Sequence, residues 1–177
     1  TAIGSNLLFS PMDVEVAKRL SELIPCVEEL KFTVTGSEAV QAAFRIMRAY
    51  TGKNVIVRFQ GNYAGWGDNV LGGRINSDVN AEIPFTDFYT IGGPEEDPYY
   101  TEGRSPLACK ETIMIPWNNF EVLEETFDKY HDIIAGIHFE GIVWNHEGLY
   151  PKPGFVEKIR ELCTKYNIVM CMDEVIT

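Results

Sequence analysis

Short apolar runs alternate along this chain with longer stretches in which apolar residues recur at helical spacing, and this alternation constrains the fold most. The runs lie at 55–59, 112–115, 133–139 and 168–172 and are rich in Val, Ile and Phe. Continuous apolar strands of this kind occur where helices cover both faces of a sheet. The sequence therefore predicts an α/β domain with a mostly parallel sheet sandwiched by helices.

Capping residues mark the expected helix boundaries. Ser10 is expected as an N-cap, followed by Pro11 and by Asp13, which completes a variant of the capping box. Pro25 ends this first helix, and Gly52 is expected just past the end of a second one. Further helices are predicted at 37–50, 119–130 and 153–166, and a further short strand at 30–34.

The apolar residues of each helix predict the face that it buries. In the helix at 37–50 the expected inward residues are Ala39, Ala42, Ala43, Ile46, Met47 and Tyr50. In the helix at 119–130 they are Leu123 and Phe127. In the helix at 153–166 they are Phe155, Val156, Ile159, Leu162 and Cys163.

Between residues 61 and 110 the periodicity fails, and Gly, Pro, Asn, Asp and Tyr dominate. A loop of this length inside a compact domain is usually functional or mobile. A disordered insertion is the alternative. It is disfavoured by aromatic residues that would tend to pack, namely Phe85, Phe88, Tyr89, Tyr99 and Tyr100.

Charge and hydropathy exclude two classes of partner. The formal net charge of −11 argues against nucleic acid, because a protein that binds a phosphate backbone needs a basic patch. No apolar run approaches the length of a membrane span. The chain starts without Met or a signal-peptide pattern and stops after an apolar run, so we expect it to be an internal fragment of a longer protein.

Neither the four cysteines nor the three histidines have the spacing of a metal site, so no metal is predicted. Cys163 and Cys171 lie in apolar stretches, where a reduced cysteine behaves as a small core residue. A reducing cytoplasm is the simplest compartment for such a chain. His138 lies in an apolar strand, which favours a buried, hydrogen-bonded histidine over a ligand.

Three segments occupy the carboxyl edge of the expected sheet, where open α/β sheets bind ligands. The first is Thr35-Gly36-Ser37, between a strand and a helix. Its glycine permits close backbone approach, and the helix N-terminus that follows offers free N–H groups to a phosphate. Taken alone, these residues are explained at least as well if Ser37 merely caps the helix.

The second and third segments carry an aromatic ring and a carboxylate. The second segment is Asn62-Tyr63-Ala64-Gly65-Trp66, which follows the strand at 55–59. Its Tyr63 could stack on a planar cofactor, although a packed loop aromatic explains it better in isolation. Asp173 ends the last apolar strand, where a carboxylate is costly to bury unless it is paired. A protonated pyridine nitrogen would pair with it. A helix cap, a surface ion pair or a metal ligand would also explain it, but no P-loop accompanies it.

The order and spacing of these segments resemble the class III aminotransferase family. Residues 35–39 (TGSEA) and 48–53 (RAYTGK) look like the family's S/T-G-[ST]-E-A turn and its R-x-[YF]-T-G-[RK] helix end. Residues 55–65 look like its K-I-I-x-F-x-G-x-Y-H-G segment, and residues 168–177 look like its L-L-I-x-D-E-V-x-T strand. The resemblance implies an aspartate-aminotransferase-like fold in which residues 1–177 form part of the large cofactor-binding domain.

Within the family the chain resembles the glutamate-1-semialdehyde aminomutase subgroup. Residues 139–145 look like the subgroup's L-E-P-V-x-x-N, and residues 151–155 look like its A-P-K-P-x-F. Two positions depart from the pattern, since Ala64 stands in place of His and Gly141 in place of Pro. These departures put the substrate in doubt and fit a divergent transaminase better than a housekeeping aminomutase.

The resemblance implies pyridoxal 5′-phosphate (PLP) as the cofactor. Thr35, Gly36 and Ser37 would hold its phosphate. Tyr63 would stack on one face of the ring, and Val175 would pack on the other.

Four more positions belong to the implied site. Asn145 would hydrogen-bond the ring hydroxyl, and Asp173 would pair with the ring nitrogen. Glu140 would lie near the active site, behind the cofactor contacts or on the substrate side. Ala64 would lie beside the cofactor at the position where the family has His.

The implied function is PLP-dependent transamination of an amino acid or amine, with a carbonyl compound as acceptor. A glutamate-1-semialdehyde-type 2,1-aminomutase and a catalytically degenerate PLP-fold protein are the alternatives. The Schiff-base lysine and the small C-terminal domain are expected outside this chain, so the fragment alone is predicted to be inactive. The resemblance also implies a homodimer whose active sites lie at the interface.

Overall fold

The computed structural model describes residues 10–71, 103, 105, 108–145 and 147–177. The chain divides into two compact units, Thr1–Val34 and Thr35–Thr177, and each is described here by itself. The aromatic residues expected to pack between 85 and 100 lie outside the described residues. No helix in the described part of the chain is both long and apolar enough to cross a bilayer.

The first unit contains the helix α1, Pro11–Leu23. Ser10 is its N-cap as predicted: the Ser10 hydroxyl accepts from the Asp13 amide at 3.2 Å, and the Asp13 carboxylate accepts from the Ser10 amide at 2.7 Å. The strand predicted at 30–34 is wrong, because the backbone there is irregular. The described part of this unit contains no strand with which residues 30–34 could form a ladder.

The second unit is built on a four-stranded sheet in the order β2-β1-β3-β4, and every pair of neighbours is parallel. The strands are β1 (Val55–Phe59), β2 (Thr112–Ile115), β3 (Ile134–Glu140) and β4 (Val169–Asp173). All four were predicted from their apolar runs. Because all four strands run parallel, their carboxyl ends share one edge of the sheet.

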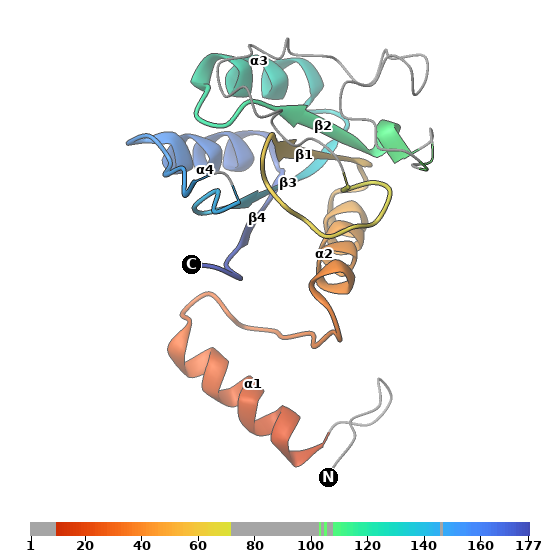
Figure 1. The fold of residues 1–177 in the computed structure, drawn as a ribbon, viewed down its shortest axis with the longest axis vertical. Helices are drawn as coiled ribbons and strands as arrows, with labels where there is room; N and C mark the ends of the chain where they lie inside the picture. Colours follow the sequence, from red (N-terminus) through yellow and green to blue (C-terminus); the bar gives the residue numbers. More distant parts are fainter. Residues whose placement is uncertain (1–9, 72–102, 104, 106–107, 146) are drawn as a thin grey trace. The chain divides into compact units, whose positions relative to one another are not determined.

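Helices cover both faces of this sheet (Figure 1). The helices α3 (Phe120–Tyr130) and α4 (Phe155–Tyr166) pack on one face. Their predicted inward residues are buried, except for Val156, which is half-buried. The aromatic rings of Phe59 and Trp117, 4.9 Å apart, fill the space between sheet and helices.

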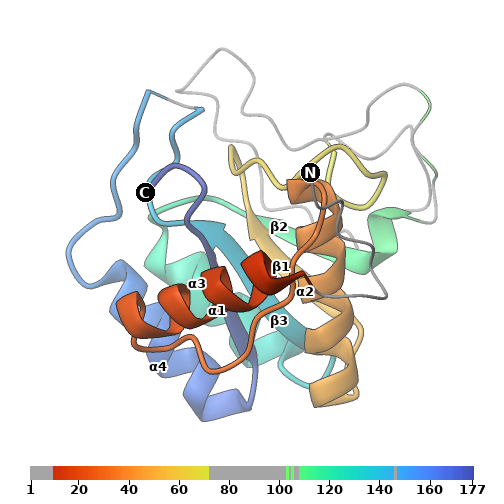
Figure 2. The same cartoon turned by 90° about the horizontal axis from the view of Figure 1, so that it is seen from below.

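The helix α2 (Gly36–Thr51) packs on the opposite face and runs beside β1 and β3 (Figure 2). Its predicted inward face is confirmed for Met47, which is buried, and in part for Ala42 and Ala43, which are half-buried. It is wrong for Ala39, Ile46 and Tyr50, which are exposed. The other buried residues are Val40 and Phe44. Apolar residues form two adjacent stripes on this helix, and the i, i+4, i+7 stripe with the bulkier side chains meets the sheet.

Glycine makes this contact possible. A Cβ atom at Gly136 of β3 would collide with the Met47 side chain, so α2 approaches the strand closely there.

On the face toward α2, the side chains of the strands change from apolar to polar along the length of the strands. Ile56 and Val169 near the amino ends pack in the apolar cluster, whereas His138, Glu140 and Asp173 lie toward the carboxyl ends.

Candidate cofactor site

The turn into α2 offers two backbone amides to a ligand. Thr35 is the N-cap: its hydroxyl accepts from the Glu38 amide at 3.2 Å, and its carbonyl accepts from the Ala39 amide. The alternative that Ser37 caps the helix is therefore wrong. Within the described residues the Gly36 and Ser37 amides have no acceptor, and a Cβ at Gly36 would meet nothing within 4 Å. Two free donors at the positive end of a helix dipole suit a phosphate.

The loop that follows β1 lies directly against this turn. Gly65 has φ +97°, and a Cβ there would come within 2.5 Å of the Ser37 hydroxyl oxygen and 3.1 Å of its Cα. Only glycine combines this backbone conformation with such close approach. Gly65 lies in the second predicted segment, but no role was predicted for it from the sequence, because its role depends on a contact between segments distant in the chain.

Glu140 and Asn62 join the ends of β1 and β3. The Glu140 carboxylate accepts from the Tyr63 amide at 2.6 Å, and the Asn62 side-chain oxygen accepts from the Glu140 amide at 2.8 Å. Both side chains are buried. The Tyr63 ring is half exposed while its backbone is held, so it can take up a ligand on its open side. Asn62 also lies in the second predicted segment, but no role was predicted for it.

Asp173 ends β4 with both carboxylate oxygens engaged. One oxygen accepts from the Val175 amide at 3.0 Å, and the other lies 3.6 Å from Nε2 of His138. The His138 imidazole, helped by the Val175 amide, holds the pKa of Asp173 below its ordinary value, although burial acts in the opposite direction. The carboxylate is thus ionised at neutral pH and keeps lone pairs for a cationic partner.

The other predicted site residues are placed differently. Ala64 is buried in the apolar cluster beneath α2, with its methyl group among core side chains. Asn145 is exposed in the loop after β3, and within the described residues no hydrogen bond links it to the rest of the site. Val175 is also exposed, and only its backbone amide contacts Asp173.

These residues fit PLP in chemistry and position. Free amides at the turn match its phosphate, a half-open tyrosine ring matches its planar ring, and an ionised carboxylate matches its protonated nitrogen. Ser37 touches the loop of Tyr63, and Tyr63 is bound to Glu140. Glu140 in turn is the register partner of Asp173. The three predicted segments therefore belong to one connected edge of the sheet.

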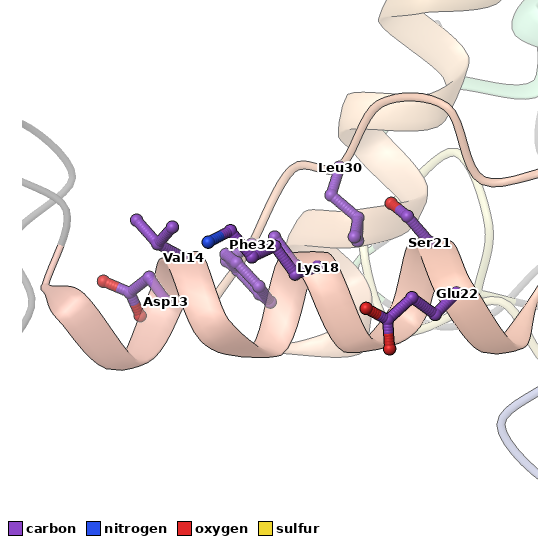
Figure 3. Close-up of a pocket in the computed structure, with 8 residues that line it drawn as sticks. Asp13, Val14, Lys18, Ser21, Glu22, Leu30 and Phe32 are labelled. Atoms are coloured by element: carbon purple, nitrogen blue, oxygen red, sulfur yellow. The ribbon is translucent and has the colours of Figure 1, made fainter.

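A pocket in the first unit does not belong to this group (Figure 3). It lies between α1 and the segment that returns along it, where Leu30 and Phe32 face the helix. Asp13, Lys18 and Glu22 contribute charged groups to its lining. None of the predicted cofactor contacts lines it.

Comparison with known proteins gives a consistent result. The model of the family described as "Aminotransferase class-III" matches residues 1–177. Glutamate-1-semialdehyde 2,1-aminomutase of Natranaerobius thermophilus is 35% identical over 166 residues, which cover 94% of this chain and 35% of that protein.

Two solved structures share the fold. An omega-transaminase from Sphaerobacter thermophilus is 28% identical with a TM-score of 0.76, covering 96% of this chain and 36% of that one. A transaminase with PLP bound is 25% identical with a TM-score of 0.77, covering 95% and 36%. The chain thus spans about a third of the length of these relatives. It belongs to the class III aminotransferase family, whose cofactor is pyridoxal 5′-phosphate.

Proposed function

We propose that the protein carrying this chain binds PLP at the carboxyl edge of the sheet and transfers an amino group from an amino donor to a carbonyl acceptor. The observation that carries the proposal is the ionised Asp173 carboxylate at the same edge as the Gly36 and Ser37 amides, which have no acceptor among the described residues. An anion site and a cation site on one connected edge suit a zwitterionic, planar ligand.

Different residues of the chain would bind different parts of this ligand. The Gly36 and Ser37 amides would bind the phosphate, and Thr35 would fix the turn by capping α2. Tyr63 would stack on one ring face, its backbone held by Glu140. Asp173 would keep the proton on the ring nitrogen, and with that proton in place PLP supplies an electron sink for bonds at the substrate's α-carbon.

Asn145 and Val175 complete the proposed contacts. Asn145 would hydrogen-bond the ring hydroxyl, and Val175 would pack on the ring face opposite Tyr63. Both side chains are exposed at the carboxyl edge and are free to meet a ligand. Ala64 offers the site only its backbone, since its methyl group is in the core.

The amine that would join PLP covalently is assigned to none of the lysines in this chain. Lys53 donates to the carbonyl at the end of α4, and Lys158 and Lys165 pair with carboxylates of α3 and α4. Those helices cover the face of the sheet away from α2. We propose that sequence outside residues 1–177 supplies the lysine and that this chain alone has no turnover.

An aminomutase is the second candidate, favoured by the 35% identity to a glutamate-1-semialdehyde 2,1-aminomutase. The two activities differ in their requirement for a second substrate. A transaminase needs an amino donor and a separate carbonyl acceptor, whereas an aminomutase converts glutamate-1-semialdehyde alone. The full-length protein should therefore be assayed with each substrate set, and the productive set identifies the activity.

The absorbance spectrum of the full-length protein tests the proposal itself. Bound PLP should give an absorbance band that shifts when an amine is added. A homodimer is proposed for the active state, and its mass in solution can be measured on the same sample. A protein that takes up no PLP would contradict the proposed function and would support a degenerate member of the fold.

A further inference from the structure

His138 is a buried polar residue that the proposed function does not use. It lies in β3 with 2% of its side chain exposed, and its ring packs edge-on against Phe44 of α2, with ring centroids 5.7 Å apart at 78°. Its Nε2 atom faces the Asp173 carboxylate at 3.6 Å. Its Nδ1 atom is buried and has no hydrogen-bond partner among the described residues.

Packing does not account for a histidine at this position. A buried ring nitrogen without a partner costs free energy that an aliphatic side chain of similar volume would not cost. The surroundings accept such a side chain, since Phe44 and Met47 of α2 line this part of the sheet. The described polar contact that an aliphatic residue would lose is the one to Asp173.

The two held oxygens give the carboxylate a fixed orientation. The Val175 amide holds one oxygen at 3.0 Å, and the imidazole faces the other from the neighbouring strand. Phe44 limits rotation of the imidazole from the helix side. A carboxylate fixed from two sides can meet a ring nitrogen without the entropy loss of ordering a free side chain.

We propose that His138 is a positioning residue for Asp173, which aligns the carboxylate with the ring nitrogen of the cofactor and so strengthens cofactor binding. The inference rests on the proposed function, since it assumes PLP as the ligand of Asp173. The charged and titratable neighbours on this face are Asp173 and Cys171 of β4, Arg58 of β1 and Glu140 of β3. The α2 residue packed on the ring, Phe44, carries no charge.

Two substitutions in the full-length protein separate positioning from a structural role. His138→Leu removes the donor and the unpartnered nitrogen, whereas His138→Gln keeps an N–H group that can reach the carboxylate. Thr126→Val is the matched control, because Thr126 is also buried with an unpartnered polar atom among the described residues but lies on α3. The probe is PLP itself, titrated by absorbance, with its ring nitrogen labelled with ¹⁵N for NMR.

The expected result is a PLP dissociation constant about tenfold higher in His138→Leu, with substantial recovery in His138→Gln and no change in Thr126→Val. The ring nitrogen of the leucine variant should lose its proton at lower pH than in the unchanged protein. This change in the titration of the cofactor nitrogen is a readout that a purely structural histidine would not move.

The outcomes distinguish this inference from the proposed function. If the unchanged protein binds no PLP, the proposed function fails and the inference fails with it. If the unchanged protein binds PLP and His138→Leu matches it in affinity and in the ¹⁵N titration, only the role of His138 is overturned. If His138→Leu does not fold, the ¹⁵N spectrum of His138 in the unchanged protein decides. A proton on Nε2 supports the role of His138, and the absence of a proton there overturns it.

Discussion

The two faces of the sheet differ in the polarity of the side chains that they bury. Toward α3 and α4 the strands present Val57, Phe59 and Ile137, which are fully buried among other apolar groups. Toward α2 the strands present a polar series near their carboxyl ends, including His138 and Asp173. The first face stabilises the fold by apolar burial along its whole length. The second face combines an apolar cluster near the amino ends of the strands with polar groups held at fixed positions near the carboxyl ends, and burying those polar groups costs free energy.

The largest change in stability is expected from Phe127→Ala, on the apolar face. Phe127 is fully buried in α3, so its truncation leaves a cavity and should reduce the free energy of unfolding by about 3–5 kcal/mol. Urea denaturation of the full-length protein measures this change. Tyr50→Ala is the control, because that aromatic side chain is exposed and should change stability by less than about 0.5 kcal/mol.

Asp173→Asn, on the polar face, should weaken ligand binding and leave the packing of the apolar core unchanged. Loss of the charge should weaken PLP binding by about ten- to a hundredfold, because a hydrogen bond to a charged partner is replaced by a neutral one. Asp132→Asn is the control, since the Asp132 side chain is 92% exposed at the end of α3. Equal PLP affinity in the two variants would show that the polar face does not hold the ring nitrogen.

The Asp173 carboxylate should also make the folding stability depend on pH. Its pKa is lowered in the folded state, so its contribution to stability is fully present above the unfolded value of about 3.9. That contribution is lost as the pH falls further, through the lowered folded pKa. The urea midpoint of Asp173→Asn should therefore change less with pH in this acid range than that of the unchanged protein, and parallel curves would contradict the pairing.

Gly65→Ala tests the contact between the loop after β1 and the turn into α2. The new Cβ would collide with Ser37 and would also strain a backbone with φ +97°, at a cost of about 1–3 kcal/mol. PLP affinity should fall as the turn is displaced. Gly67→Ala is the control, because a Cβ there finds its nearest neighbour at 3.4 Å.

The smallest effect is expected from Thr35→Ala, which removes the cap of α2. Loss of the hydroxyl that accepts from the Glu38 amide should lower stability by about 1 kcal/mol. Thr35→Ser keeps the hydroxyl and should restore most of that stability. A serine variant as weak as the alanine variant would show that capping is not the role of this side chain.

Local signals were sufficient to predict most elements of the fold. The run at 112–115 coincides with β2, and the capping box at Ser10 and Asp13 starts α1 where expected. The strand at 30–34 failed because a strand depends on partners that a local pattern does not contain. The buried face of α2 was predicted only in part, because two apolar stripes compete and the close approach at Gly136 selects one of them.

Residues of the candidate site that belong to a sequence motif could be predicted. Residues whose role depends on a contact made only in the fold could not. Gly36, Tyr63 and Asp173 follow from the order of segments at strand ends. The roles of Gly65 and His138 could not be predicted in this way, because each acts on a residue that only folding brings near. Strand register depends on pairing across the sheet, and one sequence read locally does not reveal it.

A crystal structure of the full-length protein with PLP bound would test the central proposal most directly. We expect an Asp173 carboxylate oxygen about 2.7–2.9 Å from the ring nitrogen, with the phosphate accepting from the Gly36 and Ser37 amides. A phosphate bound elsewhere, or a ring nitrogen whose partner is not Asp173, would contradict the account.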